Sequence, residues 1–509
     1  MFLKRYVYAL FIFLIFKASY SQDSFDLIFL SEGEDIRLVG DYEDGEKTGL
    51  WMGYNSDSTY IHRGNYIEGQ KTGYWNIFLG RFERARLFYR NDSLNGPYYL
   101  FYPNRQIAVK ATFKSNQLNG SWEAYREDSS LLEKGEFKDG EKEGTWVAYH
   151  KDGVAQEIVS IYQNGLLNGP YFAYDIYGDK VVETYYKNGV LSGAWEKFDF
   201  DGYVIEKGTF VEGKRDGKWE YFSGQGIVAA EEYYDEGKKI NTWFSYHRNG
   251  RIASEIRYEN DQPVGTARSW YSNKQLESIT YYQYGLADSL YQQYHRNGLL
   301  STEGEFNLGL KIGPWKYFHQ NGMIAELGRY SKDKKIGNWK SFNEEGTLLA
   351  EGSFLNDLEE GQWFFYYDNG RLESIGSFIK GVKDGLWGYF HEDGDNMKEE
   401  TWDEGQLLSI SEYTDRRGRA LSSGDLQKGN GKVINYYSDG TVFSEGPYKD
   451  GYPNGTWTFY DERGRKLTEG QLVRGVKEGN WEVYSKFGDV AIIEIYTNGE
   501  LTDKISRYN

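Results

Sequence analysis

At 509 residues, the chain has the length of about three or four ordinary domains or of one long repeat array. Its 61 Gly, 46 Tyr, 29 Phe and 15 Trp, against 7 Pro and 4 Met, favour strands and turns over long helices. The net charge of −18 argues against a nucleic-acid partner, which needs clustered Lys and Arg, and the lack of cysteine excludes disulfides and thiolate metal sites.

The chain begins with the pattern of a secretory signal. Lys4 and Arg5 precede an apolar run over 7–16, and Ser21 places a small residue directly before a predicted cut at Gln22. The run is too short to remain as a membrane-spanning helix. We therefore expect residues 1–21 to be a signal peptide and the mature chain, without a transmembrane segment, to reach the periplasm, the cell surface or the medium.

A repeat of about 24 residues fills the rest of the chain in roughly nineteen copies. Most copies have a Gly followed two residues later by an aromatic residue, as in Gly49/Trp51, Gly73/Trp75, Gly120/Trp122, Gly144/Trp146, Gly193/Trp195, Gly217/Trp219, Gly313/Trp315, Gly337/Trp339, Gly361/Trp363, Gly385/Trp387, Gly455/Trp457 and Gly479/Trp481. The copies at Gly265, Ser409 and Gly431 keep the register but lose this aromatic. A second aromatic follows three residues later in nearly every copy, as at Tyr54, Phe78, Phe101, Tyr125, Phe318, Phe342, Tyr366, Phe390, Tyr460 and Tyr484.

Two turns divide each copy into two strands. The first turn carries Asn-Gly or Asp-Gly, as at Asn321-Gly322, and the second carries pairs such as Asp139-Gly140. Because Asn-Gly and Asp-Gly supply the positive φ angles of tight turns, they predict β-hairpins. A single hairpin is marginal, so each copy must pack on its neighbours.

The repeat defines five segments. We expect a signal peptide at 1–21, a lead-in or capping strand at 22–40, regular repeats at 41–394, a degenerate repeat at 395–430, and C-terminal repeats with a cap at 431–509. The degenerate copy lacks the Trp near Ser411 and has Thr414 where the second aromatic is expected. This predicts a bend or defect in the array there.

The consensus Gly-x-Trp-x-x-Tyr/Phe-x-x-Asn/Asp-Gly resembles the MORN repeat, in particular the bacterial MORN variants often described as YwqK-type antitoxins of toxin–antitoxin systems. The likeness covers about Ile36 to Gly499. It implies an all-β fold, an elongated single-layer antiparallel sheet of tandem hairpins (a MORN-like β-solenoid). Repeats of this kind serve mainly as interaction modules, and an exported chain would not meet a cytoplasmic toxin.

Histidine is the most suggestive candidate for chemistry, because His150, His247, His295, His319 and His391 all follow the second aromatic directly. Residues in adjacent copies would lie roughly 10 Å apart, too far to share one zinc ion. The simpler interpretation is a polar residue favoured before the turn. We expect no metal and no cofactor.

Carboxylates and nucleophiles give no catalytic motif. Asp199 with Asp201 and Asp393 with Asp395 flank turn glycines, but neither pair has the further oxygen ligands of a calcium loop. A single-layer sheet offers no cleft for a glycosidase pair, and no nucleophile elbow or P-loop is present. We therefore expect a protein that is not an enzyme, and no catalytic residue is nominated.

The two aromatics of each copy, three positions apart, must point to opposite faces of the strand. One row is expected to form the core, while the other is half covered by long neighbouring side chains. The less buried row could instead be a platform for a ligand. The sequence thus favours an exported scaffold that binds proteins at the cell envelope, with a polysaccharide- or peptidoglycan-binding module and an antitoxin-like partner binder as alternatives.

Overall fold

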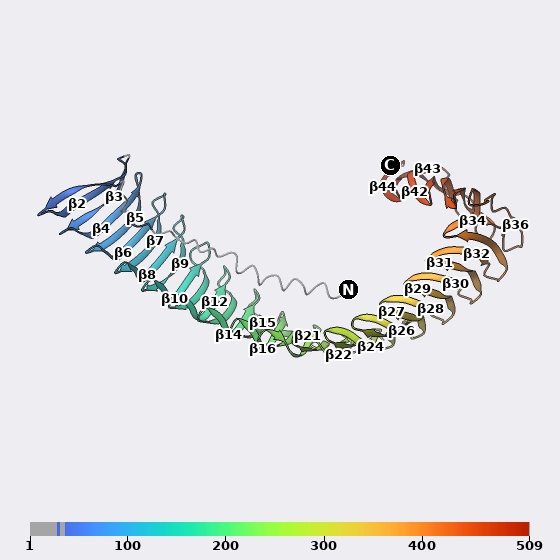
Figure 1. Ribbon diagram of the computed structural model, residues 1–509, viewed down its shortest axis with the longest axis horizontal. Coiled ribbons are helices and arrows are strands. Elements are labelled where there is room, and N and C mark those ends of the chain that lie inside the picture. The colour runs from blue at the N-terminus through green and yellow to red at the C-terminus, as the bar shows by residue number, and fades with distance from the viewer. Residues whose placement is uncertain (1–27, 31–35, 57, 508–509) are drawn as a thin grey trace. The chain divides into compact units, whose positions relative to one another are not determined.

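The computed structural model describes residues 28–30, 36–56 and 58–507, and the predicted signal peptide 1–21 lies outside these residues. The described residues form two units, one ending at Gly250 and the other beginning at Arg251. They hold strands and turns and no helix, so the all-β prediction is confirmed. In each unit, hairpin follows hairpin (Figure 1).

The strands of the first unit pair in chain order, each antiparallel to the next, except that β18 and β19 both pair with β17. They are β1 Arg37–Glu43, β2 Glu46–Tyr54, β3 Tyr60–Ile67, β4 Gln70–Leu79, β5 Phe82–Arg90, β6 Ser93–Phe101, β7 Ile107–Lys114, β8 Gln117–Tyr125, β9 Leu131–Lys138, β10 Glu141–Tyr149, β11 Gln156–Gln163, β12 Leu166–Tyr174, β13 Lys180–Lys187, β14 Val190–Phe198, β15 Val204–Val211, β16 Lys214–Ser223, β17 Ile227–Asp235, β18 Lys238–Lys239 and β19 Asn241–Tyr246.

The second unit continues the same hairpin pattern. Its strands are β20 Ile252–Glu259, β21 Gln262–Pro263, β22 Gly265–Trp270, β23 Leu276–Gln283, β24 Leu286–Tyr294, β25 Leu300–Asn307, β26 Leu310–Phe318, β27 Ile324–Ser331, β28 Lys334–Phe342, β29 Leu348–Leu355, β30 Leu358–Tyr366, β31 Leu372–Ile379, β32 Val382–Phe390, β33 Asn396–Asp403, β34 Gln406–Ile410, β35 Tyr413–Thr414, β36 Ala420–Leu421, β37 Gly431–Tyr436, β38 Val442–Lys449, β39 Tyr452–Pro453, β40 Gly455–Tyr460, β41 Lys466–Val473, β42 Val476–Tyr484, β43 Val490–Thr497 and β44 Glu500–Ser506.

The two turns of each repeat differ, which corrects part of the turn prediction. In the second turn, Asp139 and Gly140 both have positive φ, as expected for a two-residue hairpin. In the first turn only the glycine does: Gly322 has φ +86°, and its N–H donates to His319 O at 2.9 Å while His319 N–H donates to Met323 O at 2.8 Å. The chain thus makes a longer turn closed by a left-handed glycine.

The asparagine of this first turn acts through its side chain and needs no positive φ. Asn321 Oδ1 accepts a hydrogen bond from Met323 N–H at 2.9 Å, and its Nδ2 donates to Glu344 O of the next turn at 2.6 Å. Asn104, Asn273, Asn297 and Asn369 make the same inter-repeat bond. The turns of successive repeats are therefore linked to one another.

The predicted defect is a break in the sheet. β34 ends at Ile410, β35 pairs only with the short β36, and a separate eight-stranded sheet begins with β37. β33 still pairs regularly with β32, so the irregular part begins later than residue 395. The break is nevertheless closely packed, because Leu407, Tyr413 and Leu426 are only 2%, 2% and 5% exposed.

Candidate functional site

The tryptophan face, which carries the row of Trp51, Trp75, Trp122, Trp146, Trp219, Trp315, Trp339, Trp363, Trp387, Trp457 and Trp481, is the buried face of the repeats. All of these rings are at most 7% exposed. Between them lie the aromatics of the alternate strands, edge to face: the Trp387 ring centroid is 5.0 Å from that of Phe378, and Trp363 is 5.1 Å from Phe354. This confirms that one aromatic row forms the core.

Each Trp ring in this row except Trp122, which pairs with Ala111, rests on a glycine of the preceding strand. A Cβ on Gly376 would lie 2.1 Å from Cδ2 of Trp387, and Gly64, Gly135, Gly208, Gly304, Gly328, Gly352, Gly446 and Gly470 meet their Trp rings in the same way. The strand pairing shifts register at this point, as between Ile375 and Ser377. Several indole N–H groups donate to the carbonyl beside the glycine, as Trp387 Nε1 does to Ser377 O at 3.1 Å, so the interrupted ladder keeps a hydrogen bond there. The buried Nε1 atoms of Trp75 and Trp339 have no hydrogen-bond partner among the described residues.

Cations cover many of the Trp rings. Lys383 Nζ lies 4.3 Å from the centroid of Trp387, Lys335 4.0 Å from Trp339, and Lys142 3.7 Å from Trp146. Each of these lysines stands four residues before its Trp. The cation–π contact and the buried lysine stem close the outer side of the aromatic row.

The opposite face carries the second aromatic row, which is half-buried. Its residues Tyr54, Phe78, Phe101, Tyr125, Tyr174, Phe198, Phe222, Tyr246, Trp270, Tyr294, Phe318, Phe342, Tyr366, Phe390, Tyr436, Tyr460 and Tyr484 all retain intermediate exposure, and Tyr149 alone in this row is buried. Lysine stems lie over several rings, as Lys207 over Phe222 at 5.1 Å. The expectation of a row half covered by long neighbouring side chains is confirmed.

Ion pairs lie beside the rings of the opposite face. Lys340 Nζ is 2.8 Å from Glu351, which also accepts a hydrogen bond from the Tyr366 hydroxyl at 3.1 Å. Lys432 and Tyr460 hold Glu445 in the same way, at 2.6 and 2.8 Å. The hydrogen bond from Lys340 holds the pKa of Glu351 below its usual value, against the opposing effect of burial. The face therefore presents aromatic rings together with carboxylates that stay charged.

Four of the predicted histidines serve the fold. The Nε2 atoms of His150, His295, His319 and His391 lie 3.0, 2.9, 2.8 and 2.6 Å from the carbonyl oxygens of Tyr174, Phe318, Phe342 and Thr414. A carbonyl only accepts, so each Nε2 carries the proton and donates it. Tyr102, Tyr271, Tyr367 and Tyr437 make the same bond through their hydroxyls, which confirms a structural role for this position.

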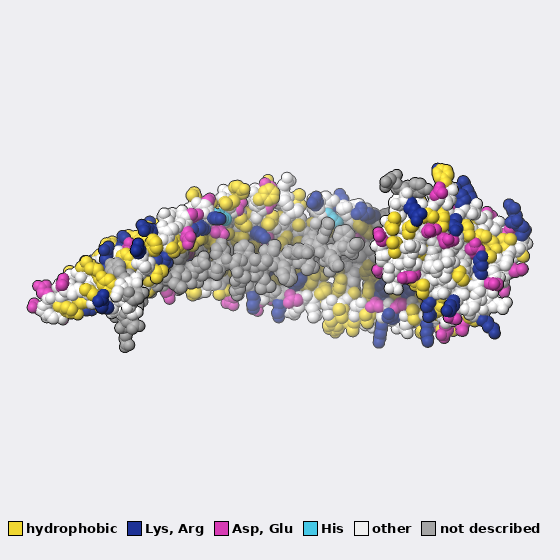
Figure 2. Space-filling model, turned by 90° about the horizontal axis from the view of Figure 1, so that it is seen from above, with side chains coloured by type: hydrophobic (Ala, Val, Ile, Leu, Met, Phe, Trp, Pro, Cys, Tyr) yellow, Lys and Arg dark blue, Asp and Glu magenta, His cyan; other side chains and the backbone are white. Residues whose placement is uncertain are grey.

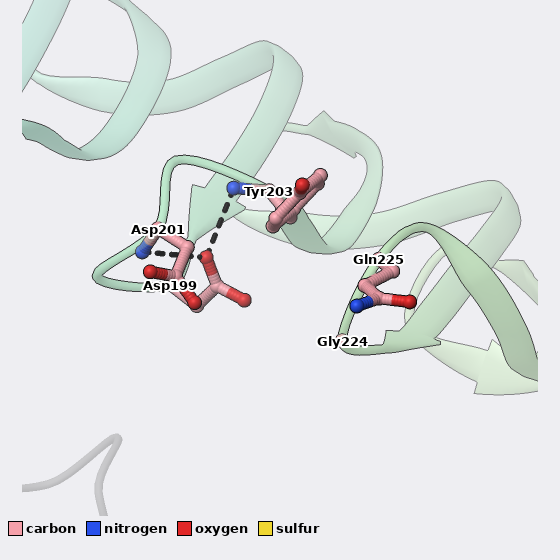
Figure 3. Close-up of a pocket in the computed structure, with 5 residues that line it drawn as sticks. All are labelled: Asp199, Asp201, Tyr203, Gly224 and Gln225. Atoms are coloured by element: carbon pink, nitrogen blue, oxygen red, sulfur yellow. Dashed lines mark hydrogen bonds between the residues drawn. The ribbon is translucent and has the colours of Figure 1, made fainter.

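The carboxylate pairs also belong to turns. Asp199 Oδ1 accepts from Asp201 N–H at 3.0 Å and from Tyr203 N–H at 2.9 Å, and Asp393 Oδ1 accepts from Asp395 N–H at 3.1 Å. Figure 3 shows Asp199, Asp201 and Tyr203 along one side of a shallow pocket, with Gly224 and Gln225 of the neighbouring turn across from them. Among the described residues, no group of three His, Asp or Glu side chains is placed to hold a metal ion.

Two sets of residues escaped the sequence reasoning. The glycine under most of these Trp rings was missed, although it recurs two residues before the second-strand aromatic, as in Gly352 and Phe354. Tyr413, one residue before Thr414, was also missed: it is 2% exposed, and its hydroxyl donates to Tyr437 O at 3.0 Å. The packing expected to be lost there is therefore present.

These features define a tandem β-hairpin repeat protein in which the recurring positions of the repeat mainly hold neighbouring repeats together. The MORN repeat variant family matches six segments, at 239–260, 263–284, 311–332, 335–356, 359–380 and 430–450. The chain therefore contains MORN-variant repeats over these six segments. The matched segments leave out the break after β34, but they also leave out regular repeats before 239 and after 450, and they do not distinguish the antitoxin subgroup.

Other comparisons add little. No curated protein matches the chain. Solved structures titled "TcdB2-TccC3-Cdc42" and "TcdB2-TccC3" each match at 11% identity and TM-score 0.12, covering 92% and 90% of this chain and 29% and 31% of theirs. A Photorhabdus luminescens Tc holotoxin pore matches at 10% identity and TM-score 0.11, covering 89% of this chain and 33% of that one. The chain thus spans about a third of their length, and scores this low carry no functional argument.

Within the described part of the chain there is no helix with the length and apolar character needed to cross a membrane. Lys and Arg side chains are interleaved with Asp and Glu on the surface seen in Figure 2. The first and last strands, β1 and β44, pair antiparallel with their neighbours in the same way as the inner hairpin strands.

Proposed function

We propose that this protein is an exported, non-catalytic repeat scaffold that binds a protein partner at the cell envelope through the opposite face. The observation that carries the proposal is the half-buried aromatic row of that face, repeated in almost every hairpin with charged side chains beside it. The tryptophan face is already filled by rings, glycines and lysines. The opposite face therefore has partly exposed aromatic rings that a partner could contact.

The opposite face has the composition of a protein-binding surface. Tyr and Trp dominate the binding energy of interfaces, because a rigid ring gains much buried area for little lost freedom. Tyr366 and Tyr460 are already oriented by Glu351 and Glu445 in the free chain, which lowers the entropy lost on binding. Apolar residues directly before the Trp position add to this face: Leu50 is 49%, Leu290 47% and Leu386 61% exposed.

The roles of the polar residues support a protein without catalysis. His319 holds the next repeat, Asp199 holds its own turn, and Glu351 is engaged by Lys340 and Tyr366. A catalytic base or nucleophile needs a free face directed at a substrate. These candidates are instead directed at the protein's own main chain and side chains.

Site-specific crosslinking tests the proposed face. A photoreactive amino acid would replace Tyr366 or Tyr294 on the opposite face, and Tyr177, a turn residue that is 88% exposed, would be the matched control. The mature protein would be irradiated in the native cell envelope. We expect protein adducts from 366 and 294 but not from 177. Adducts at all three positions alike would contradict a specific face, and glycan capture without any protein adduct would favour the polysaccharide-binding alternative.

The export half of the proposal rests on Lys4, Arg5, the apolar run and Ser21. Mass spectrometry of the protein from its native cells should find an N-terminus at or near Gln22. An intact Met1 in the cytoplasmic fraction would refute export.

A further inference from the structure

In one stretch of the tryptophan face, from β6 to β8, leucines stand where lysines cover the rings in other repeats. Leu94 stands four residues before Tyr98, and Leu118 four residues before Trp122, where Lys142, Lys311, Lys335 and Lys383 stand in other repeats. The lysines shield the rings beneath them from water. Between Leu94 and Leu118 that covering is replaced by apolar side chains.

The floor of this stretch is apolar and small. Ala85, Leu87, Ala111 and Ala124 are 0%, 0%, 5% and 0% exposed, and Val109 is 0% exposed. Comparable positions elsewhere on the same face carry polar groups, as where Lys335 pairs with Glu326 at 2.6 Å. We call this stretch, bounded by Leu87, Leu94, Tyr98, Ala111 and Phe113, the apolar groove.

Residues Ile28, Phe29 and Leu30 cover the apolar groove. The Tyr98 hydroxyl accepts a hydrogen bond from Ile28 N–H at 3.0 Å and donates one to Ile28 O at 3.2 Å. The Phe29 ring lies 6.2 Å from that of Tyr98 and meets Phe113 edge on at 6.0 Å. Ile28 and Leu30 pack against the same buried cluster.

The groove recognises residues 28–30 through the main chain of Ile28 and through the size of their apolar side chains. Tyr98 holds both main-chain groups of Ile28, which every residue except proline offers. Burial raises the pKa of Tyr98 to about 12, so its hydroxyl keeps the proton that it donates. Residues 28–30 belong to no strand, and Phe29 remains 46% exposed. The occupant is thus bound on the surface and is not part of a ladder.

We propose that the apolar groove is a binding site for an extended peptide with consecutive bulky apolar residues, and that the chain's own residues 28–30 occupy it until a partner segment of the same kind displaces them. The inference rests on the proposed scaffold function and names the chemistry of one partner. A competitor can bind only while the tethered segment is out of the groove. Its apparent Kd is therefore the intrinsic Kd divided by the fraction of molecules whose groove is open. The groove is therefore held in a state of reduced affinity.

Fluorescence polarisation tests this with a labelled peptide that copies residues 22–35. The full mature chain would be compared with the same chain carrying Ile28→Ser and Leu30→Ser, which weaken the internal occupant and leave the groove intact. We expect the double variant to bind the peptide at least about tenfold more tightly than the wild type, because the internal competitor is removed. Equal affinities, or no binding to the double variant, would overturn the proposal.

Two substitutions added to that double variant locate the site. Ala111→Glu places a charge on the groove floor and should abolish peptide binding, whereas Thr112→Glu, its neighbour on the opposite face, should leave binding unchanged. If Ala111→Glu fails to fold, as judged by circular dichroism, Tyr98→Phe serves instead, since it removes only the hydroxyl that holds Ile28 and should weaken binding several-fold. Equal losses for Thr112→Glu and the groove variants would refute the location. Crosslinking from Tyr366 is independent of all these variants, so failure here leaves the proposed scaffold function standing.

Discussion

The indole ring of Trp387 lies against the backbone of Gly376, with no room for a Cβ between them: that atom would be 2.1 Å from the ring carbon Cδ2. Trp387 is 2% exposed, is flanked by Phe378 at 5.0 Å and is covered by Lys383 at 4.3 Å. The ring therefore cannot retreat from the glycine without disturbing neighbours on its other sides. The pairing recurs along the array and sets how closely successive strands approach on the tryptophan face.

Gly376→Ala should destabilise its repeats by about 1 to 3 kcal/mol, the usual cost of inserting a methyl group into a filled core. Gly388→Ala is the matched control: Gly388 pairs with Ile375 in the adjacent strand, and its added Cβ would meet Ile375 and Phe390 at ordinary distances of 3.6 and 3.7 Å. The control should change stability by no more than about 0.5 kcal/mol. Urea unfolding followed by Trp fluorescence would compare them, and equal effects would show that the ring does not fill the space over Gly376.

Trp339→Ala should open a local stretch and leave distant repeats folded. The side chain is 2% exposed, so its loss should cost about 3 to 5 kcal/mol. In a linear stack each repeat contacts its neighbours alone, and the loss of protection should be confined to the strands around β28. Hydrogen exchange read by mass spectrometry would map it, with Leu355→Ala, at a position 56% exposed in the next strand, as the control. Uniform loss of protection along the chain would contradict independent repeats.

The regular parts of the fold were predictable because the period of 24 fixes which residues share a face. Trp339 and Phe342 are three positions apart, so their opposite orientations follow from strand alternation alone. The Gly328 contact did not follow, because it depends on how closely a ring approaches another strand's backbone. Tyr413 was missed because the sheet breaks there and the repeat register no longer applies. The contact of residues 28–30 with Tyr98 could not be predicted either, because Ile28 and Tyr98 are 70 positions apart and no local sequence pattern connects them.

The bond from His319 Nε2 to Phe342 O, at 2.8 Å, should be exchangeable for a tyrosine bond, because Tyr367 donates to Phe390 O at 2.8 Å from the same place in its repeat. His319→Tyr should leave stability within about 0.5 kcal/mol of the wild type. His319→Phe, which keeps a ring but removes the donor, should cost about 1 kcal/mol or more, since a carbonyl loses its partner. Thermal unfolding of the three proteins would decide. If both variants behaved alike, the hydrogen bond would have no part in holding the repeats together.

His62 should make the first repeats sensitive to acid. Burial lowers its pKa below the ordinary 6.5, with a smaller contribution from Lys71, and its ring fills the space over Gly53 beside Trp75. Above pH 6.5 the ring is neutral in the folded and unfolded chain, so stability is unaffected. Below that pH the unfolded chain takes up the proton first, and the free energy of unfolding falls as the pH drops toward the lower folded pKa.

Labelling the Cε1 atoms of the 6 histidines would follow this titration by NMR, with His62→Phe identifying the signal. We expect its pKa below 6.5 and a loss of N-terminal stability as the pH falls below 6.5 that His62→Phe abolishes. A His62 signal that titrates at or above 6.5 would rule out this source of acid sensitivity.

The break between β34 and β37 should be the part of the repeats whose amides exchange fastest. Between Ser411 and Asn430 the chain makes few ladder bonds: β35 and β36 pair through two residues each, and isolated bridges join Gly424 to Val433 and Gln427 to Asn430. Main-chain hydrogen bonds slow amide exchange, and those of 411–430 are mostly single bonds of short turns and bridges, such as Gly418 N–H to Asp415 O at 2.9 Å, which open more easily than a long ladder. Amides of 411–430 should therefore exchange fastest within the repeats, even though the segment is well packed.

The strands on either side supply the comparison. β33 at Asn396–Asp403 pairs with β32 along its length, so we expect its amides to be protected like those of β31, although they fall within the segment first assigned to the degenerate repeat. Hydrogen exchange of the wild-type chain distinguishes the two possibilities. Low protection from 395 onward would place the weak point in the whole repeat, while protection through β34 followed by fast exchange at 411–430 would place it in the break itself. Strong protection across 411–430 would mean that side-chain packing alone replaces the missing ladder.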